Sequence, residues 1–130
     1  MIITFSVPAL TLSQNQIDKM HWTEKMSLRD EWLWRIRIAL KEKNLVLETA
    51  TEETKSVHIL RVSKRLIDDG NVPSGAKYLL DALVKERLLR DDSRKWARVT
   101  FDQRKARSDE GDHMEITIAP VSQANPEYQL

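Results

Sequence analysis

Hydrophobic positions along the chain alternate with polar ones in some segments and recur at helical spacing in others. Alternation predicts four short strands, over residues 2–7, 56–62, 96–101 and 114–118. Helical spacing predicts a long helix over 22–43 and a second helix over 75–87. The resulting order, β-α-β-α-β-β, predicts an α/β (α+β) fold: a single mixed sheet of about four strands with two packed helices.

The segments between these elements are polar and rich in turn-forming residues. We expect loops over 9–20, 48–54, 64–74 and 103–112, with Ser74 or Asn71 capping the second helix. Residues 1–120 then form one domain, and residues 121–130 form a flexible C-terminal tail. The long helix has its main apolar stripe on one side (Leu28, Trp32, Ile36, Ala39 and Leu40), while Trp34 and Ile38 project from nearly the opposite side. A homodimer partner is one way to cover that second side.

The composition of the chain is that of a globular protein and argues against a membrane-spanning, secreted or disulfide-linked one. The chain has 130 residues, 41% hydrophobic and 32% charged, which is a globular balance. No apolar run approaches the roughly 18–20 residues that span a membrane, and no secretion signal is recognisable. Cysteine is absent, which excludes disulfides and thiolate nucleophiles and fits a reducing cytoplasm. No nucleotide-cofactor or other small-molecule cofactor motif is present.

The net charge of +1 hides an uneven distribution. Between Arg61 and Arg107 there are thirteen basic against seven acidic residues, and the rest of the chain carries eight against thirteen. A basic half indicates a surface for a polyanion, although charged residues also coat any small domain.

Two acidic pairs lie at junctions between predicted elements. Asp68-Asp69 follows the second strand, and Asp91-Asp92 follows the second helix. Adjacent carboxylates repel one another unless they share a cation, and Mg²⁺ prefers carboxylate and phosphate oxygens. If the pairs meet in space, we expect Asp68 or Asp69 to share a divalent cation with Asp92. The same residues are also typical of turns and caps on solvated loops.

Basic residues surround both pairs, as expected where a metal site acts on a polyanionic strand. The candidate DNA-binding residues are Lys64, Arg65, Asn71, Arg90, Arg94, Lys95 and Arg98. Lys77 lies early in the second helix, off its apolar stripe, and either faces a scissile phosphate or pairs with Asp81. Trp96 is the tryptophan best placed to stack on a base, whereas the three histidines lack metal-ligand spacing and are interpreted as structural.

One stretch of about 30 residues carries a family resemblance. Asn71, Lys77, Asp81-Ala82-Leu83 and Asp91-Asp92 occur in order along it, with four residues from Lys77 to Asp81 and eleven from Asp81 to Asp92. This pattern resembles the core of the RusA-type Holliday junction resolvases, which are bacterial and prophage endonucleases. Asn15 and His21-Trp22 resemble the family more loosely.

The resemblance implies a homodimeric, Mg²⁺-dependent endonuclease, with Mn²⁺ as a substitute ion, that resolves four-way DNA junctions in recombination and repair. It implies a cytoplasmic protein encoded by a bacterium or phage. Asp68 and Asp92 would be metal ligands and Lys77 the catalytic lysine facing the phosphate. Gly70 stands where the family has a second aspartate, so Asp69 is the substitute ligand if a positive φ at Gly70 turns it inward.

Two alternatives differ in function. One is a catalytically impaired RusA-like dimer that binds branched DNA without cutting, because Gly70 removes a ligand. The other is a protein-interaction module that uses the Trp34 and Ile38 face.

Overall fold

The computed structural model describes residues 2–45, 47 and 52–121. The elements are strands β1 (Ile3–Val7), β2 (Lys55–Ser63), β3 (Ala97–Lys105) and β4 (His113–Pro120), helices α1 (Gln14–Asp18), α2 (Trp22–Glu42) and α3 (Lys77–Lys85), and the 3-10 turn η1 (Asp69–Asn71). The four strands form one mixed sheet in the order β1-β4-β2-β3. The predicted fold class is confirmed. No helix in the described ranges is long and apolar enough to cross a membrane.

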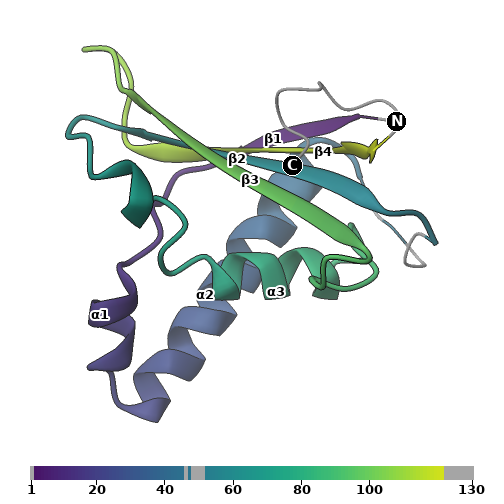
Figure 1. Cartoon of the computed structure of the whole chain (residues 1–130), viewed down its shortest axis with the longest axis horizontal. Coiled ribbons are helices and arrows are strands. Elements are labelled where there is room, and N and C mark those ends of the chain that lie inside the picture. The colour runs from purple at the N-terminus through teal and green to yellow at the C-terminus, as the bar shows by residue number, and fades with distance from the viewer. Residues whose placement is uncertain (1, 46, 48–51, 122–130) are drawn as a thin grey trace.

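The sheet combines antiparallel and parallel pairing. β4 is antiparallel to both β1 and β2, whereas β2 and β3 are parallel neighbours. A parallel pair needs a crossover connection, and α3 provides it by lying between β2 and β3 in sequence. Figure 1 shows α2 and α3 on the same face of the sheet.

Strand register builds the core on that face in rows. One row aligns Ile3, Ile118, Val57 and Val99, and the next aligns Phe5, Ile116, Ile59 and Phe101. Against these rows pack the fully buried Ile36 of α2 and Leu79 and Leu83 of α3. The next row along the strands aligns Val7, Met114, Arg61 and Gln103, so two polar side chains replace apolar ones at one end of the sheet.

The two helical stripes match their predictions. On α2, Trp32, Ile36, Ala39 and Leu40 are buried, while Trp34 is 58% exposed and Ile38 39% exposed. On α3 and its N-cap the residues at the predicted helical spacing are buried or pack against the core: Ala76, Leu79, Leu80, Leu83 and Val84. The exposed side of α2 therefore has no cover within the described residues of one chain.

Three local predictions are wrong. The predicted loop 9–20 contains α1, which Ser13 and Gln16 begin with a capping box. The predicted loop 103–112 is shorter, because β3 continues to Lys105 in register with β2. The N-cap of α3 is Ala76, with no side-chain cap, because the Ser74 hydroxyl instead accepts a hydrogen bond from the Gln14 amide at 2.7 Å.

The predicted link and tail fall largely outside the described residues. This applies to residues 48–51 of the link and to 122–130 of the tail.

Candidate functional site

The first acidic pair lies at the end of the sheet where β2 and β3 finish. Asp68 immediately precedes η1, and the Asp69 carboxylate accepts a hydrogen bond from Gln103 Nε2 at 2.6 Å. Gln103 also bonds the backbone of Ile67 in both directions, at 3.1 and 2.6 Å. The β3 side chain thus fastens the 67–69 segment to the sheet.

The second acidic pair lies at the other end of the sheet, in the segment that joins α3 to β3. Asp92 lines a pocket of about 510 Å³ with Arg94, Ala97, Arg98 and Val99 at the start of β3. The five residue steps from Arg98 to Gln103 cover about 16 Å at the rise of an extended strand. Figure 1 places η1 and the 86–96 segment at opposite ends of α3.

The structure therefore does not bring the two acidic pairs together. The described residues contain no group of three or more acidic or histidine side chains able to hold a metal ion. The physical reason is α3, which runs from one pair to the other and whose nine residues span about 13 Å. Asp68, Asp69 and Asp92 of one chain do not fit a shared Mg²⁺, and no chemical step is assigned to that set.

The expected role of Gly70 is also wrong. Among the glycines only Gly75 has a positive φ, so Gly70 does not turn the loop through the left-handed region. Asp68 to Asn71 instead close a 3-10 turn through the Asn71 N–H and the Asp68 carbonyl, at 2.8 Å. A Cβ at Gly70 meets no atom within 4 Å, so other side chains fit there.

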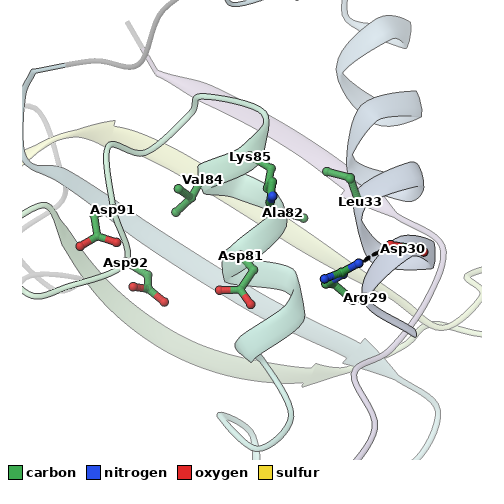
Figure 2. Close-up of a pocket in the computed structure, with 9 residues that line it drawn as sticks. All are labelled: Arg29, Asp30, Leu33, Asp81, Ala82, Val84, Lys85, Asp91 and Asp92. Atoms are coloured by element: carbon green, nitrogen blue, oxygen red, sulfur yellow. Dashed lines mark hydrogen bonds and ion pairs between the residues drawn. The ribbon is translucent and has the colours of Figure 1, made fainter. Parts of the chain in front are cut away.

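Asp92 has a different carboxylate neighbour, Asp81, which was placed in the resemblance pattern and beside Lys77 but was not predicted as a site residue. Asp81 of α3 and Asp92 line one pocket of about 530 Å³, called here the Asp92 pocket. Its lining comes from α2, α3 and the following segment: Arg29, Asp30, Leu33, Asp81, Ala82, Val84, Lys85, Asp91 and Asp92. Figure 2 shows the Asp81 and Asp92 carboxylates on the same side of α3, with Arg29 across the pocket.

In the Asp92 pocket, nearby cations partly neutralise the negative charge of Asp81 and Asp92. Burial, and then the charge of Asp92, raise the pKa of Asp81, while Lys77, Arg29 and Lys85 oppose that rise. Lys77 is exposed on the first turn of α3 and acts on Asp81. No ion pair between Lys77 and Asp81 is found among the described contacts, so both the predicted pairing and the role of Lys77 toward a phosphate stay predictions.

The predicted basic residues are divided between the two ends of the sheet. Arg90 and Lys95 lie over the Trp96 ring, 5.4 and 5.1 Å from its centroid. Together with the exposed Arg94 and Arg98 they form the Trp96 cluster. Arg90 also pairs with Glu52 at 2.7 Å. Because two cations already lie over the indole, Trp96 positions positive charge, and the predicted base stacking would require those cations to move.

Lys64, Arg65 and Asn71 follow β2 at the opposite end, where Asn71 lines a second pocket of about 440 Å³. This pocket, called here the Arg61 pocket, is lined by Thr11, Ser13, Gln14, Asn15, Gln16, Arg61, Ile67, Asn71 and Ser74. It brings together Asn15 and Asn71, which lie 56 residues apart and both belong to the noted resemblance. Gly75 allows this close approach: its φ is +75°, and a Cβ there would lie 1.7 Å from the Leu12 carbonyl oxygen.

Arg61 was not among the predicted site residues, although the sequence carried a signal for it. It follows Val57 and Ile59 at strand spacing, so it shares their inward face. An arginine at such a position is unusual, because charged residues are rarely buried without a partner.

The histidines are structural where their contacts are clear. His21 caps α2, with its ring nitrogen accepting from the Thr23 amide at 3.4 Å. His113 bonds the Gly111 carbonyl at 2.9 Å at the start of β4.

No protein-family model matches this chain, and no curated protein matches it.

Proposed function

We propose that this protein binds branched DNA, with four-way junctions as its preferred ligand. The observation that carries this proposal is the Trp96 cluster, in which an indole, Arg90 and Lys95 concentrate positive charge beside Arg94 and Arg98. Cations on an exposed segment bind a phosphate backbone without reading its sequence. The resemblance to RusA-type proteins supports the choice of a junction over a plain duplex and fits a cytoplasmic protein of a bacterium or phage.

Preference for a junction over a duplex requires recognition of the shape of the DNA, and a symmetric homodimer would recognise that shape. A four-way junction is nearly two-fold symmetric, so two copies of the Trp96 cluster would bind two equivalent arms. Trp34 and Ile38 are exposed one helical turn apart on α2 and support an apolar dimer interface. Sedimentation at micromolar concentration tests this part, and a monomer with and without junction DNA would contradict it.

The DNA-binding proposal is tested by fluorescence anisotropy on a labelled four-way junction and a duplex of the same length. We expect the junction to bind more tightly, and log K to fall with log salt at a slope of about −3 or steeper, since each phosphate contact contributes about −0.9. Equal affinity for junction and duplex would refute the shape preference. Absence of salt-sensitive binding would refute the DNA proposal and leave the protein-interaction module.

A second candidate function is Mg²⁺-dependent cleavage of the junction. It is favoured by the Asp92 pocket, in which Asp81 and Asp92 repel one another enough to contribute to the raised pKa of Asp81. Mg²⁺ is commonly held by one or two protein carboxylates together with substrate phosphates, so these two side chains would hold it. The ion would supply charge neutralisation at the phosphate, and Lys77, Arg29 and Lys85 are cations near Asp81.

The cleavage assay separates the two candidates through four variants. If the Asp92 pocket is the centre, Asp92→Asn and Asp81→Asn abolish Mg²⁺-dependent cutting, while Asp69→Asn leaves it unchanged. If the ligand set implied by the resemblance operates instead, Asp69→Asn abolishes cutting. If the implied site is weakened only because Gly70 replaces the second family aspartate, Gly70→Asp raises cutting. The open space around Gly70 makes that variant sterically acceptable. Binding without cleavage in every variant supports the binding function alone.

A further inference from the structure

The Arg61 pocket contains a guanidinium whose hydrogen-bonding capacity is only partly used. Arg61 Nη1 approaches the Thr11 carbonyl only at 3.5 Å, the outer limit of a hydrogen bond. Its Nε is buried, and the described residues offer that atom no partner. A buried donor without a partner costs on the order of 1–3 kcal/mol, so a ligand that engages this guanidinium recovers free energy.

The electrostatics are consistent with an arginine that lacks a close carboxylate. Burial lowers the pKa of Arg61, and the charge of Asp112 acts in the opposite direction. No hydrogen bond or ion pair joins Arg61 to Asp112 among the described contacts, and the Asp112 carboxylate accepts from the Lys64 amide at 2.9 Å. Asp112 therefore compensates Arg61 only at a distance.

The walls of the pocket are suited to an anion. The described lining holds no carboxylate, and it presents the hydroxyls of Ser13 and Ser74 and the amides of Asn15 and Asn71. Asn15 and Asn71 are exposed at the surface, so an incoming ligand reaches them first. A planar guanidinium with neutral N–H and O–H donors around it matches the oxygens of a phosphate.

The size of the pocket indicates what carries the phosphate. About 440 Å³ exceeds the volume of one water-sized ion and lies within the range of small-ligand sites. One nucleotide unit fits that range. The nearby Asp69 does not line the pocket, and its carboxylate accepts a hydrogen bond from Gln103 Nε2.

We propose that the Arg61 pocket binds the phosphate group of a nucleotide unit, with Arg61 as the charged donor and Asn15 and Asn71 as neutral donors at the rim. The phosphate comes either from a DNA strand or from a free nucleotide. The first source rests on the proposed DNA-binding function, whereas the second does not.

Nuclear magnetic resonance on the full chain tests the site directly. The probes are inorganic phosphate, a deoxynucleoside monophosphate and the four-way junction, with chloride at equal ionic strength as the reference. We expect saturable shifts of the Arg61 Nε–H and of the Asn15 and Asn71 side-chain amides. We also expect Arg61→Gln to weaken monophosphate binding by about tenfold or more, because it removes a charge-assisted bond.

Matched variants guard against a general loss of fold or charge. Arg35→Gln removes one positive charge from α2, where Arg35 pairs with Glu31 at 2.7 Å, and should leave the shifts unchanged. If Arg61→Gln does not fold by circular dichroism, Asn71→Ala replaces it, since Asn71 is exposed and its side chain lies at the rim. We expect this rim variant to weaken binding severalfold.

The outcomes separate this inference from the DNA proposal. If the junction binds but neither phosphate probe shifts Arg61, and Arg61→Gln and Asn71→Ala leave junction affinity unchanged, the phosphate site is refuted and DNA binding stands. If the monophosphate binds in an Arg61-dependent manner while the junction does not bind, the site stands with a free nucleotide as ligand and the DNA proposal fails. Shifts that do not saturate, or that persist unchanged in Arg61→Gln, would also refute the site.

Discussion

The two ends of the sheet both carry positive charge, but they hold it in different ways. At one end Arg61 projects from the central strand β2 onto the helix-covered face. The strand register fixes its position beside Gln103 of β3. At the other end the Trp96 cluster lies on an exposed connection after α3, where Arg90 and Lys95 collect around an indole. The Arg61 end therefore offers one half-buried cationic donor, whereas the Trp96 cluster offers several solvated cations.

This difference implies different sensitivities. A half-buried charge is weakly screened and depends on the packing around it, whereas exposed charges are screened by salt and tolerate substitution. Ligand binding at the Arg61 end should therefore respond to changes of shape. Binding at the Trp96 end should respond to ionic strength.

The largest expected effect comes from filling the space at Gly75. In Gly75→Ala the new Cβ would lie 1.7 Å from the Leu12 carbonyl oxygen, at a backbone φ of +75°. We expect a loss of about 3 kcal/mol in the free energy of unfolding, measured with urea, because both clash and strain must be relieved. Gly70→Ala and Gly111→Ala are the controls, since no atom lies within 4 Å of a Cβ at either position, and each should change stability by less than about 0.5 kcal/mol. A tolerated Gly75→Ala would mean that the 9–13 and 71–76 segments do not pack closely.

The next effect concerns the Trp96 cluster. Replacing both Arg90 and Lys95 by alanine should weaken junction binding about tenfold at physiological salt and reduce the salt slope by nearly 2, at about 0.9 per phosphate contact. Anisotropy titrations at several salt concentrations measure both quantities. Arg35→Gln combined with Lys43→Gln removes the same charge from α2 and its C-cap residue and should leave the slope unchanged. Equal losses in the two double variants would indicate that net charge, and not this cluster, governs binding.

A smaller effect is expected from Asp81. Its pKa lies above the ordinary value of 3.8, so the folded state holds the proton more tightly than the unfolded state. Stability then falls as pH rises through the range above 3.8. Asp81→Asn removes this dependence of stability on pH. We therefore expect the variant to gain stability over the wild type between pH 3 and pH 7, as measured by the midpoints of urea unfolding. In an Asp92→Asn background the difference should shrink, because one cause of the raised pKa is gone.

A further effect concerns the loop that joins β3 to β4, two strands that are separated in the sheet by β2. The hydrogen bond from the Arg104 side chain, followed by the Arg107 amide, lowers the pKa of Glu110 from 4.5 to about 2. The contribution of Glu110 to stability is therefore complete above 4.5 and is lost as pH falls toward 2. Side-chain carbon resonances should show a midpoint near 2, and Arg104→Gln should raise it. Arg107→Gln leaves the backbone donor in place, so a rise equal to that of Arg104→Gln would contradict the assignment.

Periodicity alone predicted most of the fold, because helix and strand stripes in this chain are local consequences of where apolar residues recur. The stripe of Trp32, Ile36, Ala39 and Leu40 and the alternation of Ile3, Phe5 and Val7 are visible in sequence and buried in the structure. The capping box that begins α1 was also readable, as a serine three residues before a glutamine. It was missed because the five-residue helix shows no apolar period.

The site depended on tertiary structure. Local sequence shows that Asp68-Asp69 and Asp91-Asp92 flank a helix, but the distance between the pairs depends on how α3 lies along the sheet. Because α3 crosses from β2 to the start of β3, it keeps the pairs at opposite ends and makes Asp81 the carboxylate facing Asp92. The same packing joins Asn15, Asn71 and Arg61 around one pocket. Their sequence spacing does not encode this, since the contact depends on the fit of Gly75 against Leu12.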